Sequence, residues 1–173
     1  GCALYMRDRG VLPVSGVVAA YPVCDCDFET PSYLEYGEGC YLTRALMETF
    51  WEWYTPDLVD RYHPYAAPLR GNLRDLPPSL LLMAAMDPLC SEGEKLATAL
   101  LDAGNHCQSV TYSGVGHAFM SHSNRISAGR EAFGVLGEWL GSLSGSGYSK
   151  QPRQLQPVRD ACSYDALPQP STV

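Results

Sequence analysis

The chain has 173 residues, a length suited to one domain or to a large part of one. Hydrophobic residues make up 46% of it, enough for a buried core, and no apolar run approaches the roughly 18 residues that a membrane span needs. The net charge of −7, with scattered basic residues, argues against nucleic acid and anionic membranes as partners.

The first predicted element is the end of a helix over residues 4–10. Arg7 and Arg9 suit the negative end of a helix, and Gly10 suits the position just past it. The body of this helix would precede residue 1, and the chain starts with neither Met nor a signal sequence. We therefore expect that an N-terminal part of the domain is missing from the sequence.

Three short apolar runs are predicted to be strands, over residues 15–21, 79–86 and 107–112. The first two are continuously apolar and end at Pro22 and at Asp87-Pro88, a pattern typical of strands buried on both faces. Ser91 and Glu94 match a capping box, which predicts a helix between the second and third strands that stops at Gly104. A strand, helix and strand in this order predict two parallel strands.

The remaining segments are predicted as follows. Residues 25–39 and 56–78 are rich in turn formers and predict loops. Two further helices are expected over residues 42–54 and 125–140, with these side chains turned inward: Leu42, Leu46, Phe50, Trp53, Ile126, Phe133, Leu136 and Leu140. The fold class is thus α/β, a mostly parallel sheet with helices on both faces over residues 1–141, followed by a flexible tail over 142–173.

Two residues with catalytic chemistry stand at the ends of neighbouring predicted strands. Asp87 directly follows the second strand, and His117 lies in a glycine-rich loop after the third. Ligands of open parallel sheets bind at the carboxyl ends of the strands, so these loops should be neighbours. A carboxylate that accepts the Nδ1–H of a histidine leaves Nε2 free to take a proton from a hydroxyl, as in a nucleophilic triad. The alternative for each residue alone is a turn-forming aspartate and a solvated loop histidine.

Other candidates are weaker. His122 is the one rival to His117, His63 lies in a long loop, and His106 opens the third strand at the wrong end for catalysis. The aromatic cluster Phe50, Trp51, Trp53 and Tyr54 could line an acyl pocket, but core packing is the more common role of such a stripe. Cys90 is expected to be a small buried residue.

The seven cysteines are odd in number and irregularly spaced. The spacing favours reduced thiols in an intracellular protein and no metal site. The one close pair, Cys24 and Cys26, is a weak metal signal by itself.

Two stretches that carry these candidates resemble motifs of one enzyme family. Residues 76–89 (LPPSLLLMAAMDPL), followed by Glu92-Gly93, resemble the acid motif of hormone-sensitive-lipase-like carboxylesterases, which have the α/β-hydrolase fold. Residues 112–119 (YSGVGHAF) resemble their histidine motif. Weaker matches at residues 21–25 and 65–69 keep the same order along the chain.

The resemblance implies the C-terminal part of an α/β-hydrolase that hydrolyses small carboxylic esters without a cofactor or metal. Asp87 would be the triad acid and His117 the general base. The family's serine lies in a Gly-x-Ser-x-Gly turn, and neither this turn nor the upstream glycine-rich oxyanion stretch occurs here. The chain alone is therefore expected to be inactive. A prolyl-oligopeptidase-like peptidase and a non-catalytic binding protein or truncated product remain open alternatives, and oligomeric state and localisation are left undetermined.

Overall fold

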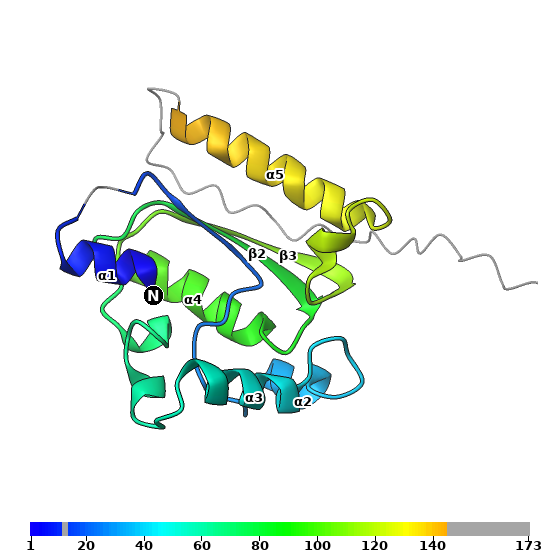
Figure 1. Cartoon of the computed structure of the whole chain (residues 1–173). Coiled ribbons are helices and arrows are strands. Elements are labelled where there is room, and N and C mark those ends of the chain that lie inside the picture. Colours follow the sequence, from blue (N-terminus) through cyan, green and yellow to red (C-terminus); the bar gives the residue numbers. More distant parts are fainter. Residues whose placement is uncertain (12–13, 145–173) are drawn as a thin grey trace, which may run out of the picture.

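The computed structural model describes residues 1–11 and 14–144 of the chain (Figure 1). Its centre is a parallel three-stranded sheet in the order β1 (Val17–Ala20), β2 (Ser79–Met86) and β3 (Cys107–Gly116). In the register of the sheet, Ser79 of β2 lies between Val17 of β1 and Cys107 of β3. The predicted class, an α/β fold with a parallel sheet, is confirmed.

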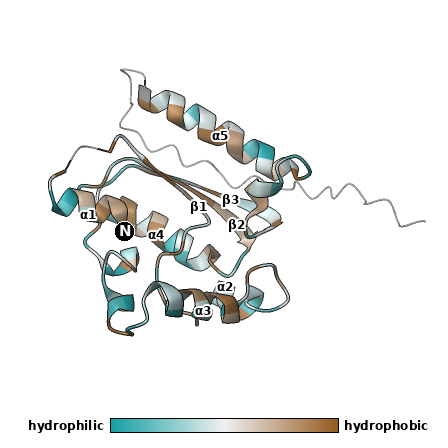
Figure 2. Ribbon diagram, viewed as in Figure 1, coloured by the Kyte–Doolittle hydropathy of each residue, from teal (hydrophilic) through white to brown (hydrophobic). Residues whose placement is uncertain are grey.

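Helices cover both faces of this sheet because β2 is apolar on both sides. Leu80, Leu82 and Ala84 face α5 (Ser127–Ser144), whereas Leu81 and Met83 pack toward α4 (Cys90–Asp102) and α1 (Cys2–Asp8). Figure 1 shows α5 on one side of the sheet and α1 and α4 on the other. Figure 2 shows the hydrophobic strands enclosed between these helices.

A third cluster of buried side chains joins α2 (Pro31–Tyr36) and α3 (Arg44–Tyr54) to the loop after β2. The sequence predicted a loop over residues 25–39, but α2 lies within this range. Pro31 stands at the first helical turn of α2, where its missing N–H costs nothing, and the Tyr33 side chain is buried. Short 3₁₀ turns at Asp60–Tyr62 and Pro68–Arg70 interrupt the loop that leads to β2.

The inward faces of two helices differ from the sequence prediction. On α3, Met47 and Trp51 are buried, whereas Leu46, Phe50 and Trp53 are 42%, 41% and 75% exposed. Both sets recur at helical spacing, so periodicity alone could not choose between them. On α5, the predicted Phe133 and Leu140 are about half exposed, and the small Ala128 and Ala132 with Trp139 pack on the sheet instead.

Two further element boundaries were predicted wrongly. Helix α4 starts at Cys90 with no side-chain cap, so the capping box of Ser91 does not form. The Ser91 hydroxyl instead accepts the Ser32 N–H at 3.1 Å and thereby ties α4 to α2. Strand β3 continues to Gly116, past the predicted end at residue 112, because Gly116 still pairs with Met86 beyond an irregularity in the ladder.

Two other expectations concern the ends of the described chain. Strand β1 lies at one edge of the three-stranded sheet, and Val18 is 40% exposed, so β1 is not buried on both faces. The last helix reaches Ser144, and the tail expected over 142–173 lies, from residue 145 on, outside the described residues.

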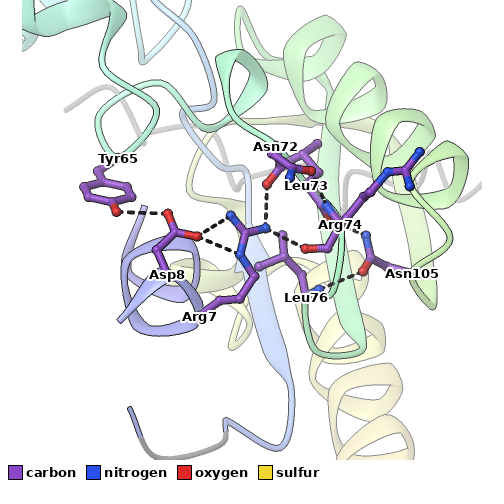
Figure 3. A network of polar contacts seen from close by, with 8 residues as sticks. All are labelled: Arg7, Asp8, Tyr65, Asn72, Leu73, Arg74, Leu76 and Asn105. Atoms are coloured by element: carbon purple, nitrogen blue, oxygen red, sulfur yellow. Dashed lines mark hydrogen bonds and ion pairs between the residues drawn. The ribbon is translucent and has the colours of Figure 1, made fainter. Parts of the chain in front are cut away.

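A polar network fastens α1 at the edge of the sheet where the strands begin (Figure 3). The Arg7 guanidinium donates to the carbonyl oxygens of Asn72 and Arg74, each at 2.5 Å, and also binds the Asp8 carboxylate. The Asn105 side chain accepts the Leu76 N–H at 2.8 Å. These bonds connect α1 and the end of α4 to the segment that leads into β2.

Candidate functional site

Asp87 and His117 meet at the edge of the sheet where the strands end. Asp87 directly follows β2, and His117 directly follows β3, the neighbouring strand. His117 Nδ1 lies 2.8 Å from Asp87 Oδ2, so the two predicted site residues are in hydrogen-bonding contact. The other carboxylate oxygen of Asp87 accepts the Leu89 N–H at 3.0 Å. Both Asp87 oxygens thus have partners, as a carboxylate that is only 1% exposed requires.

The turn after His117 fixes the direction of the imidazole. Ala118 has φ 62°, a left-handed conformation that non-glycine residues rarely adopt. The next residue, Phe119, is buried and packs against the Tyr112 ring at a centroid distance of 5.1 Å. The buried aromatic side chain therefore anchors the turn, and the Asp87 carboxylate orients the ring that the turn presents.

Tyr21, at the end of β1, is a third residue of the site. Its ring lies against the His117 imidazole, with centroids 4.7 Å apart, and its backbone has φ 38°. Backbone strain in a non-glycine residue beside a polar pair is typical of functional sites. Sequence reasoning treated Tyr21 only as part of a weak motif, although its place at the end of the strand next to β2 could have identified it.

Glu92, in the first turn of α4, is a fourth residue, which the resemblance to the acid motif included without assigning it a role of its own. It is 1% exposed, and its Oε1 accepts the Cys24 N–H at 2.6 Å. Burial raises the pKa of this carboxyl group to about 8, although hydrogen bonds from the backbone oppose the shift. The position of Glu92, five residues after Asp87, is visible in the sequence, but its burial is not.

An apolar cavity of about 440 Å³ opens beside His117. Its walls come from α3, from the segment after β1 and from the start of α1, and they include Val23, Leu42, Met47, Phe50, Trp51, Tyr54 and Leu89. The aromatic cluster of α3 thus contributes to the cavity as well as to the core. Of its four members, only Trp51 is buried, so the expectation of a mainly structural stripe fails for Phe50, Trp53 and Tyr54.

The remaining histidines do not join the site. His122 is exposed at the end of the turn Phe119–His122. His63 Nδ1 accepts the Tyr65 N–H at 3.1 Å in the long loop. The backbone carbonyl of His106 accepts the Ser79 N–H where β2 and β3 begin, at the opposite edge of the sheet. The structure therefore brings together His117 and Asp87, and not the rival histidine.

The cysteines show no sign of a reactive or metal-binding centre within residues 1–11 and 14–144. Six cysteines of this part are free thiols, and no group of three or more His, Cys, Asp or Glu side chains could hold a metal ion there. Cys90 is buried as expected, and desolvation raises the pKa of its thiol to about 12. Cys162 lies outside the described residues. Over the same part of the chain, no helix is both long and apolar enough to cross a membrane.

Comparisons with known proteins agree with this architecture. The chain is 35% identical over 111 residues to vegetative-specific protein H5 of Dictyostelium discoideum, covering 62% of the chain and 33% of that protein. It is 34% identical over 124 residues to ethyl acetate hydrolase of Pseudomonas putida, covering 71% of the chain and 39% of that enzyme. The chain thus spans between a third and two fifths of these two relatives.

Solved structures give the same result. A thermostable carboxylesterase from a metagenomic library superimposes with a TM-score of 0.79 at 32% identity, over 83% of the chain and 50% of that protein. An esterase of Pyrobaculum calidifontis superimposes with a TM-score of 0.74 at 34% identity, over 82% and 46% of the two chains. A family model of the alpha/beta hydrolase fold matches residues 1–121. The chain therefore belongs to the hormone-sensitive-lipase-like family of α/β-hydrolases, and its sequence corresponds to part of that fold.

Proposed function

We propose that the protein takes part in carboxylic ester hydrolysis by serine-triad acyl transfer, with Asp87 as the acid and His117 as the general base. One observation carries the proposal: the Asp87–His117 contact of 2.8 Å at the ends of two parallel strands, beside an apolar cavity. The relatives that are named as an ethyl acetate hydrolase and a carboxylesterase support the same reaction class.

In this mechanism the Nδ1–H of His117 donates to Asp87, which fixes the tautomer and leaves Nε2 to accept a proton. A serine hydroxyl loses its proton to Nε2 as its oxygen attacks the ester carbonyl. The tetrahedral intermediate collapses when the bond to the alcohol oxygen breaks and Nε2 returns the proton to that oxygen. Water then repeats the two steps on the acyl-enzyme and releases the carboxylic acid. Asp87 stabilises the imidazolium in both halves of the cycle.

The cavity supports a small ester with an apolar acyl or alcohol group as substrate. Its lining is almost entirely aliphatic and aromatic, and His117 lies at its wall. An uncharged substrate also suits a chain with a net charge of −7.

The 173 residues contain no Gly-x-Ser-x-Gly turn, so we propose that this chain alone has no serine-esterase turnover. A fluorophosphonate serine probe tests this directly, because it labels only an activated serine. We expect no labelling of the isolated chain. Covalent labelling that is abolished by His117→Ala would show that one of its own serines is the nucleophile.

A chimera tests the acid and base roles. The chain replaces the corresponding part of the Pseudomonas putida ethyl acetate hydrolase, which supplies the remainder of the fold. We expect the chimera to hydrolyse p-nitrophenyl butyrate and to bind the fluorophosphonate probe. His117→Ala should abolish turnover, whereas the matched His122→Ala, at an exposed histidine five residues away, should leave it unchanged. A folded chimera that lacks activity, or an active His117→Ala variant, would favour a non-catalytic binding role instead.

A further inference from the structure

His117 is held on two sides by residues from two different strand ends. On one side, the Asp87 carboxylate after β2 binds Nδ1. On the other, the Tyr21 ring after β1 packs on the imidazole at an interplanar angle of 59°. The hydrogen bond alone leaves the imidazole free to tilt about the Nδ1–Oδ2 axis, and the Tyr21 ring blocks that motion. The placement of Tyr21 therefore matters for the direction of Nε2.

The placement of Tyr21 depends on the segment that follows it. The Tyr21 N–H donates to the Leu82 carbonyl at 2.6 Å, which is the last bond between β1 and β2. Tyr21 has a positive φ, and three residues later Cys24 is completely buried. The Cys24 carbonyl accepts the Leu69 N–H at 3.1 Å, and its N–H donates to Glu92 Oε1 at 2.6 Å. The bond to Glu92 joins this segment to the first turn of α4.

Glu92 is an unusual residue for a purely structural contact. Its carboxyl group is buried, and Oε2 has no hydrogen-bonding partner within residues 1–11 and 14–144. Two other carboxylates, Asp25 and Asp87, act on it unfavourably, and burial raises its pKa further. A buried polar group with an unused oxygen destabilises a fold relative to an apolar side chain of the same shape. Buried acids in such an environment are common at functional sites.

We propose that Glu92 is a positioning residue, which binds the Cys24 backbone, fixes the segment after β1 against α4, and so holds the Tyr21 ring on His117. Glu92 lies five residues after Asp87 on the same continuous stretch of β2 and α4. The acid that binds His117 and the acid that fixes Tyr21 thus lie close together in the sequence, where β2 leads into α4. The inference rests on the proposed function, since it assigns Glu92 a role in orienting the general base.

The contact between Tyr21 and His117 can be measured in the full 173-residue chain by NMR, without a nucleophile. The ring current of Tyr21 displaces the imidazole C–H resonances of His117, and Tyr21→Leu should abolish that displacement while it leaves the Glu92–Cys24 bond in place. Glu92→Leu should abolish it as well, because the segment after β1 loses its anchor. Glu92→Gln keeps an oxygen acceptor for the Cys24 N–H and should preserve the displacement. Glu94→Leu, at an exposed position of the same helix, is the matched control.

Activity in the chimera gives a second measurement. Glu92→Leu should lower kcat by about 10- to 100-fold, the effect expected from a misplaced catalytic group, with little change in KM. Glu92→Gln should restore kcat, which a simple loss of folded protein would not allow. The two measurements separate this inference from the proposed function: an active His117→Ala chimera refutes the triad, whereas the NMR displacement tests Glu92 alone.

Three results would overturn the role of Glu92. The first is a Glu92→Leu chain that folds and keeps the His117 displacement. The second is a Tyr21→Leu chain whose His117 resonances match the original chain. The third applies even where Glu92→Leu fails to fold: in the unmodified chain, a Cys24 amide that exchanges with solvent deuterium as fast as an exposed amide would show that the Glu92 bond does not hold the segment.

Discussion

The two edges of the sheet hold their polar groups in opposite ways. Where the strands end, Asp87 and Glu92 are buried, Tyr21 and Ala118 have positive φ, and one carboxyl oxygen is unpartnered within the described residues. Where the strands begin, the Arg7 network lies near the surface, and its donors meet backbone carbonyls and an exposed carboxylate (Figure 3). The first edge places energetically unfavourable features around the proposed catalytic pair, Asp87 and His117, whereas the contacts at the second edge hold α1 to the rest of the fold.

This contrast means that substitutions at the two edges should have different consequences. At the site edge, changes should affect catalysis or should stabilise the protein by removing an unfavourable feature. At the opposite edge, changes should lower stability and leave His117 as it is. Each substitution below tests one side of this contrast.

The largest effect is expected for Asp87→Asn in the chimera. Asparagine keeps the size of the side chain, but its amide cannot hold the His117 tautomer that accepts a proton at Nε2. We expect kcat to fall on the order of 10⁴-fold, measured with p-nitrophenyl butyrate. Asp8→Asn, at the opposite edge, should leave kcat within about threefold, a difference below 1 kcal/mol. Equal losses for both variants would refute the assignment of the two edges.

Glu92→Gln should raise stability in a pH-dependent way. The pKa of Glu92 is raised from its ordinary value of 4.5 to about 8, so between these values the folded state binds more protons than the unfolded state. The stability contributed by this group is full below about pH 4.5 and is lost as pH rises toward 8. Glutamine does not ionise and avoids this loss, so the variant should be more stable at pH 8.5 by a few kcal/mol, at about 1.4 kcal/mol per pKa unit.

Urea unfolding of the chain at pH 4.5 and pH 8.5 measures this difference. We expect the two proteins to be nearly equal at the lower pH and to diverge at the higher one. Glu94→Gln, at an exposed position of the same helix, is the matched control. A Glu92→Gln difference that is the same at both pH values would mean that ionisation of Glu92 does not limit stability.

The sequence was sufficient to predict the contact between Asp87 and His117 and the parallel pairing of β2 with β3. Asp87 directly follows a predicted strand, and His117 lies in the loop after the next one. Because parallel strands end at the same edge of a sheet, the two residues could be expected to lie close together. Strand β2 was predicted at its observed bounds, since two prolines and an Asp-Pro enclose a run that is apolar on both faces. These features depend on local sequence and on general topology alone.

Features that depend on packing could not be predicted in this way. The buried face of α3 is set by α2 and the loop after β2, and two stripes on that helix have the same period. The Ser91 hydroxyl binds Ser32, 59 residues away, so the local capping pattern was overruled by a tertiary contact. The roles of Tyr21 and Glu92 depend on segments that meet only in the folded chain.

A smaller effect is expected for Arg7→Met at the opposite edge. Methionine keeps part of the apolar stem, but it removes the donors that bind the Asn72 and Arg74 carbonyls. Bonds from a charged donor contribute about 1.5–3 kcal/mol when buried, and this guanidinium is partly exposed, so we expect a loss of about 1–2 kcal/mol in urea unfolding. Arg9→Met, which loses a ring contact with Tyr5, should cost about 0.5 kcal/mol.

The His117 resonances supply the decisive readout for Arg7→Met. If the two edges act independently, the imidazole shifts should match those of the unmodified chain. A change in the displacement of His117 by Tyr21 would show that α1 couples the network to the site, and the contrast between the edges would then fail.

The smallest expected effect is a change in stability when glycine replaces a residue with positive φ, and it should differ between the two edges of the sheet. Ala118 beside His117 and Asp75 before β2 both have left-handed backbones, with φ 62° and 57°. Alanine is disfavoured in this conformation, whereas aspartate tolerates it through its short polar side chain. Ala118→Gly should therefore raise stability by about 0.5 kcal/mol, a gain that is small because glycine also gives the unfolded chain extra freedom. Asp75→Gly should give no gain. Midpoints of urea unfolding measure both, and a loss of stability in Ala118→Gly would show that the turn after His117 is held without strain.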